Sequence, residues 1–163
     1  MDKFGLKISE EKSKIIEFGR FTCQMAKKYG FKFETFVFLG FTHFCDKTRT
    51  GKFKLGRKTS RKKFIQKMKD VNLWLKGIRN RVELKEWWNL LRIKLLGHYQ
   101  YYGMSGNGRW IQNFYHKTVR LVFKWINRRS QRKSYNWDQF YNFIQFNPLP
   151  KPKIYHSIYN LNA

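Results

Sequence analysis

The chain has 163 residues, of which 42% are hydrophobic and 19% aromatic, so it can bury a core and is not disordered throughout. It carries 35 Lys and Arg against 10 Asp and Glu, a formal net charge of +25 at pH 7. Such a chain repels itself, and a bound polyanion relieves that repulsion while releasing its own condensed counterions. Nucleic acid is therefore the first candidate partner. A membrane surface is the second, but the basic residues do not gather beside an apolar anchor.

Other functional classes lack their sequence signals. Residues 1–7 do not contain the apolar core of a signal peptide, and no apolar run is long enough to cross a bilayer. Cys23 and Cys45 have neither the spacing nor the additional Cys and His residues of a disulfide framework or a zinc site, although His43 lies close to Cys45 in the sequence. We therefore expect no metal ligands, no membrane association and a reducing, cytoplasmic location.

The first 57 residues are predicted to contain strands. Short apolar-rich runs at 6–8 and 14–18 are separated by polar sequence. Residues 36–41 are almost continuously apolar, which is typical of a strand covered on both faces. Gly40 within this run indicates a bulge or a close approach of another group to the backbone.

A hairpin is predicted next, because the polar segment 46–51 turns the chain back into residues 52–55. These strands cannot close a sheet by themselves. They are typical of the trailing edge of a larger α+β domain whose beginning is missing.

From Thr59 onward the apolar residues follow a helical period. Ser60 can cap a first helix, and a second is expected from Asn80 or Val82 to Tyr102. A third helix should follow Asn107, and a shorter one should span 137–146. The apolar residues assigned to the inner sides of the first and third helices are Phe64, Met68, Val71, Leu75, Ile78, Ile111, Phe114, Thr118, Leu121, Val122 and Trp125.

A tyrosine-rich corner, residues 95–103, lies at the end of the second helix. Gly103 and Gly106 are predicted to end that helix, and Asn107 is placed to cap the next one. Two interpretations remain open: a bundle corner whose tyrosines pack and hydrogen-bond, or a corner that faces a nucleic-acid strand.

No catalytic centre can be argued from the sequence. Metal-assisted phosphoryl transfer needs clustered carboxylates, but the acidic residues are scattered, and the adjacent pair Glu10-Glu11 lies in a polar turn. No nucleophile triad or phosphate-binding glycine loop has the required spacing. The chain is expected not to be an enzyme by itself, although it could be part of one.

Several segments, taken in order, resemble the motifs of group II intron-encoded reverse transcriptases. Residues 5–8 and 11–20 resemble the late palm motif, with Ser13 where the family usually has threonine. Residues 38–43 are similar to the primer-grip hairpin. The likeness continues through the thumb, also called the maturase or X domain, in Leu91-Arg92, residues 97–103, residues 128–131, Trp137, Phe140 and residues 148–154.

This resemblance implies an α+β fold with a palm remnant over 1–57, a mainly helical thumb over 58–147 and an extended Pro-rich tail over 148–163. It implies an RNA-directed DNA polymerase that also serves the splicing and mobility of its intron. The family's fingers, earlier palm and Tyr-Ala-Asp-Asp loop are missing from the chain. Magnesium would belong to those missing aspartates, so polymerase activity is expected only with a fingers–palm partner.

The resemblance also suggests site residues. Lys12 matches a lysine near the phosphates of the incoming nucleotide, and Phe38, Leu39, Gly40 and Phe41 match the primer grip. As plain structure, Lys12 would be an exposed turn lysine and 38–41 a core strand. The residues expected to contact intron RNA or a template–primer duplex are Arg61, Lys62, Lys63, Lys67, His98, Tyr101, Tyr102, Arg109, Arg120, Arg128, Arg129 and Arg132.

An RNA-binding role is favoured by the first of the predicted helices, whose outer face is strongly basic. Such a run is usually only a solvated face, but here almost no carboxylates balance it. A free-standing basic RNA-binding module that serves no polymerase is the alternative. A helical DNA-binding protein is disfavoured because no helix-turn-helix with a short glycine turn is present.

Overall fold

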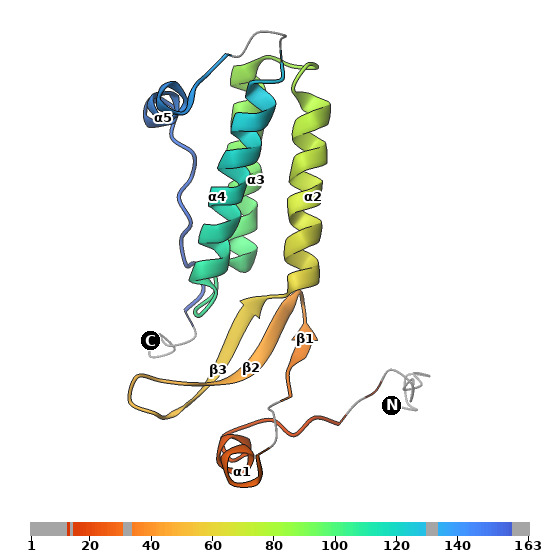
Figure 1. Ribbon diagram of the computed structural model, residues 1–163, viewed down its shortest axis with the longest axis vertical. Coiled ribbons are helices and arrows are strands. Elements are labelled where there is room, and N and C mark those ends of the chain that lie inside the picture. The colour runs from red at the N-terminus through yellow and green to blue at the C-terminus, as the bar shows by residue number, and fades with distance from the viewer. Residues whose placement is uncertain (1–12, 14, 31–33, 130–133, 158–163) are drawn as a thin grey trace. The chain divides into compact units, whose positions relative to one another are not determined.

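The structure is a computed structural model that describes residues 13, 15–30, 34–129 and 134–157 (Figure 1). Within these residues the three strands form one antiparallel sheet in the order β1-β2-β3. The α+β class predicted from the sequence is therefore confirmed. The elements in chain order are α1 (Thr22–Tyr29), β1 (Phe36–Phe38), β2 (Phe41–Lys47), β3 (Phe53–Thr59), α2 (Arg61–Ile78), α3 (Leu84–Tyr102), α4 (Gly108–Ile126) and α5 (Trp137–Phe146).

The described residues divide into two compact units. The first lies within 1–36 and 43–56, and the second, here called the helical unit, lies within 37–42 and 57–163. The helical unit therefore includes the turn between β1 and β2 as well as the end of β3. This division places the candidate site of the protein entirely within the helical unit.

The first unit departs from the sequence-based expectation. The strand predicted at 14–18 is wrong for residues 15–18, which have no regular structure, and α1 was not predicted. A strand needs a neighbour for its backbone groups, and the sheet supplies none to this apolar run. The predicted run at 6–8 lies outside the described residues. The hairpin around 46–51 is confirmed, and Lys54 forms a salt bridge of 3.0 Å with Asp46.

Residues 36–41 do not form one continuous strand, which corrects the prediction. The chain reverses at Leu39 and Gly40, whose φ values of 48° and 80° are both positive. Positive φ at both central residues is the pattern of the type I′ hairpin turn, where glycine is favoured. The predicted close approach at Gly40 is confirmed, since an added Cβ would lie 3.2 Å from the Tyr102 hydroxyl.

The helices after Thr59 follow the predicted pattern closely. Ser60 caps α2 by accepting a hydrogen bond of 3.4 Å from the Lys63 amide. The start of α5 carries a capping box between Asn136 and Gln139, and its bounds match the prediction. These caps satisfy backbone amides that have no partner within the helix.

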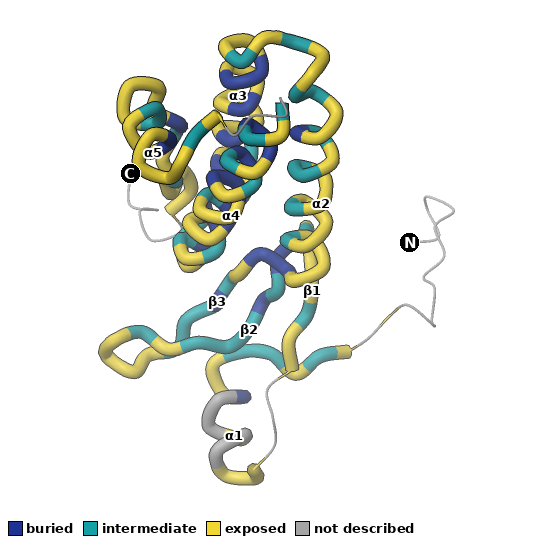
Figure 2. The backbone as a smooth tube through the Cα atoms, turned by 45° about the horizontal axis from the view of Figure 1, so that its top comes forward, coloured by how far each residue is buried: buried dark blue, intermediate teal, exposed yellow. Residues whose placement is uncertain are grey.

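The core of the helical unit lies between α2, α3 and α4, which run side by side (Figure 1), with buried residues on their facing sides (Figure 2). In α3, Trp87 and Tyr99 are fully buried, and in α4 Val122 is. Burying a large apolar side chain contributes about 1.5–3 kcal/mol, so the facing sides of these helices stabilise the helical unit. Among the predicted inner residues of α4, Leu121 is only half-buried.

Asn107 is the N-cap residue of α4, as predicted, but its side chain makes no cap hydrogen bond. The side chain is instead fully buried. The amide oxygen accepts from the Thr59 amide at 2.7 Å, and the amide nitrogen donates to the Tyr102 carbonyl at 2.8 Å and to the Thr59 hydroxyl at 2.9 Å. Asn107 thus joins the end of β3 to the end of α3.

Candidate nucleic-acid interface

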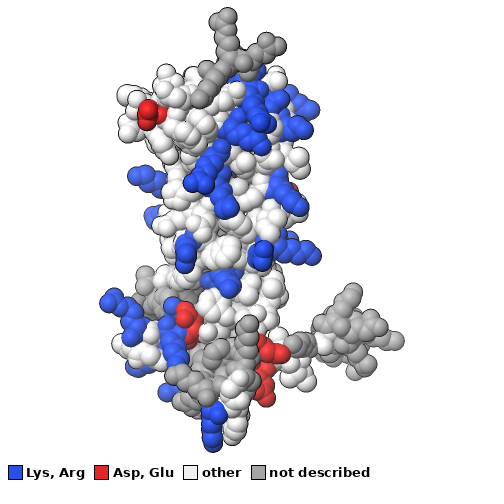
Figure 3. All heavy atoms as spheres, viewed as in Figure 1, with Lys and Arg blue, Asp and Glu red and all other residues white. Residues whose placement is uncertain are grey.

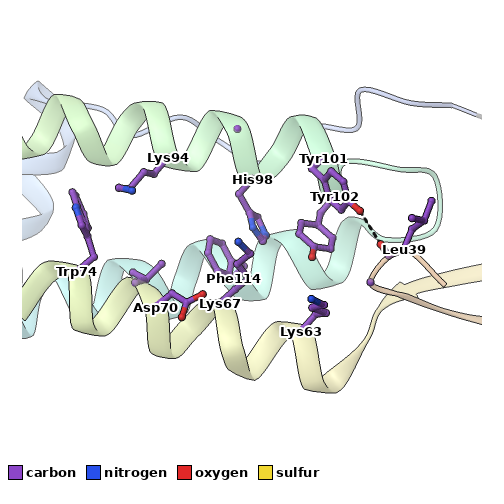
Figure 4. Close-up of a pocket in the computed structure, with 13 residues that line it drawn as sticks. Leu39, Lys63, Lys67, Asp70, Trp74, Lys94, His98, Tyr101, Tyr102 and Phe114 are labelled. Carbon is purple, nitrogen blue, oxygen red and sulfur yellow. Dashed lines mark hydrogen bonds between the residues drawn. The ribbon is translucent and has the colours of Figure 1, made fainter. Parts of the chain in front are cut away.

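A cleft of about 660 Å³ lies between α2 and α3 (Figure 4). It exists because α4 packs closely against both helices and Phe114 of α4 forms part of its lining. On α2 the lining residues follow one stripe, from Lys63 through Lys67 to Trp74, and on α3 they run from Lys94 to Tyr102. Their spacings of three, four and seven residues place them on one side of each helix.

The turn between β1 and β2 lies at one end of the cleft. The Tyr101 hydroxyl donates a hydrogen bond of 2.9 Å to the Leu39 carbonyl (Figure 4). The Ser60 amide, just before α2, donates to the Gly40 carbonyl at 2.9 Å. Two consecutive carbonyls of the turn therefore accept hydrogen bonds, one from α3 and one from the residue just before α2.

Positive charge predominates along the cleft. Lys63 and Lys67 are exposed side chains of α2, and among the described residues neither forms a salt bridge. Asp70 is the carboxylate of the lining, and it accepts a hydrogen bond of 2.8 Å from Gln66. Lys94 lies opposite, with its Nζ 5.1 Å from the centre of the Trp74 ring. The cleft thus has two cations of like charge near the turn, whereas one carboxylate, Asp70, and one cation, Lys94, line it farther along.

His98 projects from α3 into the cleft between Phe114 and Tyr102 (Figure 4). Its ring stacks on Phe114 with centroids 3.6 Å apart and lies 4.7 Å from the Tyr102 ring. Burial lowers the pKa of His98 to about 4, and the positive charge of Lys67 adds to this effect. His98 is therefore neutral at physiological pH and can donate and accept hydrogen bonds without adding charge.

A second, shallower groove of about 460 Å³ lies between α2 and α4. Lys69 of α2 and Lys117 and Arg120 of α4 line it together with apolar side chains such as Ile65 and Leu121. The sequence of α4 contains no Asp or Glu, so its cations have no acidic neighbour on their own helix. Figure 3 shows Lys and Arg side chains spread over this face of the helical unit, with few acidic ones among them.

Further cations surround the ring of Trp125, near the end of α4. Its Nε1 donates a hydrogen bond of 2.9 Å to Asn72, which also lines the groove. The Arg79 guanidinium lies 4.6 Å from its ring centre, Lys124 Nζ lies at 5.0 Å and the Arg128 guanidinium at 5.6 Å. The α2–α4 basic face is therefore defined here as Lys69, Arg79, Lys117, Arg120, Lys124 and Arg128.

Several of the site residues suggested by the sequence come together in the cleft. Those that line it are Leu39, Gly40, Lys63, Lys67, His98, Tyr101 and Tyr102. Phe38 does not line it and is exposed, whereas Phe41 is only 5% exposed and packs against the rings of Tyr101 and Tyr102.

The other suggested residues lie elsewhere. Arg120 and Arg128 belong to the α2–α4 basic face. Arg129 is half-buried and donates a hydrogen bond of 3.5 Å to the Val82 carbonyl. Arg61, Lys62 and Arg109 are exposed at the starts of α2 and α4 and line neither hollow. Lys12 and Arg132 lie outside the described residues.

Sequence reasoning missed Trp74 and Lys94 in the cleft and Lys117 in the groove, whereas Lys69 of the groove belongs to the basic outer face predicted for the first helix. Trp74 lies seven residues after Lys67, and Lys94 lies four before His98, so helical spacing from the chosen residues would have found both. The helical period of α2 and α3 was therefore enough to indicate that these residues share a face with the predicted site residues.

Comparison with known proteins gives no relative for this chain: no family model matches it, and neither do curated proteins or solved structures. Among the described residues, no helix is both long and apolar enough to cross a membrane. The same residues contain no group of three or more His, Cys, Asp or Glu side chains that could hold a metal ion.

Proposed function

We propose that this chain binds RNA through its helical unit, as the late palm and thumb of a group II intron reverse transcriptase and maturase. In this proposal it grips the template–primer duplex and the intron RNA, and it has no polymerase activity alone. The chemistry and its magnesium ions belong to a fingers–palm portion that acts as its partner. A free-standing RNA-binding module is the alternative.

One observation carries the RNA-binding proposal: cations outnumber carboxylates in the hollows on both sides of α2. Lys117 and Arg120 lie in the open groove, and Lys63 and Lys67 lie in the cleft. Basic side chains on a broad, shallow surface can contact phosphates of a duplex, whose recognition depends on backbone and shape. Most of the formal charge of +25 remains unpaired until a polyanion binds.

The reverse transcriptase context rests on the sequence motifs and gains support from one contact. The turn of the primer-grip-like segment, Leu39 and Gly40, is hydrogen-bonded by Tyr101 of the thumb-like motif and by the Ser60 amide. Two segments that resemble neighbouring family motifs are thus neighbours in space as well. This arrangement would place a nucleic-acid end beside the basic helices.

The first experiment measures RNA binding by the full chain across a series of salt concentrations. We expect the affinity for a structured RNA to fall by about a thousandfold or more from 50 to 200 mM salt, given about six to ten phosphate contacts. Exchanging Lys117 and Arg120 together for alanine should weaken all RNAs by about tenfold and make the salt slope shallower by about one to two units. Arg129 is left intact because it bonds the Val82 carbonyl.

The matched control is Lys85→Ala, which removes one exposed charge of α3 that lines neither hollow. Its affinity and salt slope should stay close to those of the wild type. Because the control removes one charge and the double variant two, a control that loses half as much binding free energy as the double variant would show that only net charge matters. Salt-independent binding would contradict the phosphate mechanism.

A second experiment separates the polymerase context from the free-standing module. The chain alone, given magnesium, nucleotides and a primed RNA template, should extend nothing, and templated DNA synthesis by it would contradict the proposal. Affinity purification from the source cell should recover a polypeptide with fingers, palm and an Ala-Asp-Asp loop. Recovery of RNA without such a polypeptide would favour the free-standing module.

A further inference from the structure

We propose that the cleft between α2 and α3 holds a short unpaired stretch of the bound RNA, with phosphates at Lys63 and Lys67 and a base against the Trp74 ring. The inference rests on the proposed RNA binding and adds a preference for unpaired nucleotides. It concerns the cleft alone and not the α2–α4 basic face.

The dimensions of the cleft suit a single strand. From Lys63 to Trp74 the lining of α2 extends over eleven residues, about 16 Å at 1.5 Å per residue. Its volume of about 660 Å³ lies in the range of small-ligand sites and is too small to admit a duplex. A cleft of this length fits about two unpaired nucleotides better than a single free nucleotide.

The charges orient the strand. Lys63 and Lys67 are one helical turn apart, with Cβ atoms about 5–6 Å from each other, which is comparable to the distance between successive phosphates of a single strand. Asp70 follows them along α2, and its carboxylate repels phosphate from the region beyond. The phosphates therefore belong at the end near the turn and the base at the end near Trp74.

The rings of the cleft leave Trp74 as the stacking partner for that base. His98 has Phe114 on one side and Tyr102 nearby, and the Tyr102 ring packs against Phe41 and Tyr101. Trp74 is half-buried, and the Lys94 ammonium lies 5.1 Å from the centre of its ring.

A base can take the place of that ammonium, because the flexible lysine stem allows Lys94 to move to the edge of the cleft and contact the sugar or phosphate instead. Stacking of a base on an aromatic side chain is worth about 1–3 kcal/mol and tolerates any base. Together with two phosphate-binding lysines, this describes a sequence-tolerant site for single-stranded RNA.

The test compares two RNA hairpins that differ only in a two-nucleotide bulge in the stem. The full chain should bind the bulged hairpin about tenfold more tightly than the fully paired one. Trp74→Leu should abolish this preference, whereas Trp74→Phe, which keeps a ring, should restore much of it. Exchanging Lys117 and Arg120 for alanine should weaken both hairpins equally and keep their ratio.

A second measurement uses the wild-type chain, so it does not depend on how the variants fold. A 2-aminopurine placed in the bulge should lose fluorescence on binding as it stacks on the indole, and the paired hairpin should show no such change. Equal affinities for the two hairpins with unchanged fluorescence would overturn the inference while leaving RNA binding in place. Failure to bind either hairpin at low salt would overturn the proposed function as well.

Discussion

The two sides of α2 differ in kind although both are basic. Toward α4, Lys69 faces an open groove with Lys117 and Arg120, and the cations there project from a shallow surface. Toward α3, Lys63 and Lys67 face a deeper cleft that is lined by rings and bounded by a strand turn. If RNA binds as proposed, the first arrangement would respond to charge and shape, whereas the second would also distinguish an unpaired base from a paired one.

The comparison teaches that net charge alone does not describe how a basic protein binds. The groove needs only exposed cations, so its contribution should change little when the helices shift slightly. The cleft needs α2, α3 and the β1–β2 turn in fixed positions. Changes that loosen this end of the helical unit should therefore affect the cleft before they affect the groove.

The largest expected effect comes from Asn107→Ala. This change removes three buried hydrogen bonds and leaves the Thr59 amide and Tyr102 carbonyl without their partner, at a cost of about 2–4 kcal/mol in the free energy of unfolding. Chemical denaturation measures it. Asn113→Ala, on the exposed face of α4, should change the stability by less than about 0.5 kcal/mol, and an equally small loss at Asn107 would contradict the role of the network.

The next effect is a loss of stability in mild acid caused by His98. The unfolded chain binds a proton at the ordinary His pKa of 6.5, whereas the folded chain resists protonation until about pH 4. The unfolded state therefore binds more protons in this window, and stability falls as the pH is lowered from about 6.5 to 4, by about 2–3 kcal/mol in all.

His98→Phe keeps a ring against Phe114 but cannot be protonated. The difference in unfolding free energy between wild type and variant should therefore change with pH only inside that window. Carboxylates that titrate in both proteins cancel in the difference. A constant difference from pH 7 to pH 4 would show that His98 does not carry the pH dependence.

A smaller effect is expected for Gly40→Ala, which acts on the cleft and spares the groove. A φ of 80° is strained for alanine, and the new Cβ would lie 3.2 Å from the Tyr102 hydroxyl, so we expect a loss of about 1–2 kcal/mol in thermal unfolding. Gly77→Ala is the matched control in α2, where an added Cβ meets nothing within 4 Å. It should stabilise the protein by about 0.5–1 kcal/mol.

The smallest expected effect is a gain. Leu39 has a φ of 48°, which a leucine adopts at a cost that glycine avoids. Leu39→Gly should raise the stability by about 0.5 kcal/mol, after the greater freedom of glycine in the unfolded chain is subtracted. Leu39→Val, with its branched Cβ, should lower it, and identical melting temperatures for the two variants would show that the turn carries no strain.

The helices were predictable because local signals define them. Ser60 caps α2, and the apolar period of α2 and α5 continues without interruption, so their bounds follow from nearby residues alone. The turn at Leu39 was missed because leucine is an unusual residue at positive φ, and the run around it is uniformly apolar. The β1–β2 hairpin depends on which segments pair as strands, and a hydrophobic pattern does not specify that pairing.

The candidate site was predictable only in part. Lys63 and Lys67 stand out on a basic helix face, and Tyr101 and Tyr102 stand out by composition. Trp74 and Lys94 join them because α4 fits against both α2 and α3 and leaves a cleft between the two. Which helices pack together is a tertiary property. Sequence reasoning therefore identified several residues of the site but not the helix packing that forms the cleft.

The hydrogen bonds of the β1–β2 turn connect the end of α3 to the start of α2. Because Tyr101 holds one of its carbonyls and the Ser60 amide holds the next, α3 and the start of α2 cannot separate at this end without breaking one of these bonds. Beyond Trp74, residues 79–83 connect α2 directly to α3, so the two helices are joined at both ends of the cleft. A strand bound as proposed would therefore enter and leave through the side of the cleft, with its phosphates at Lys63 and Lys67 next to the end that the turn fixes.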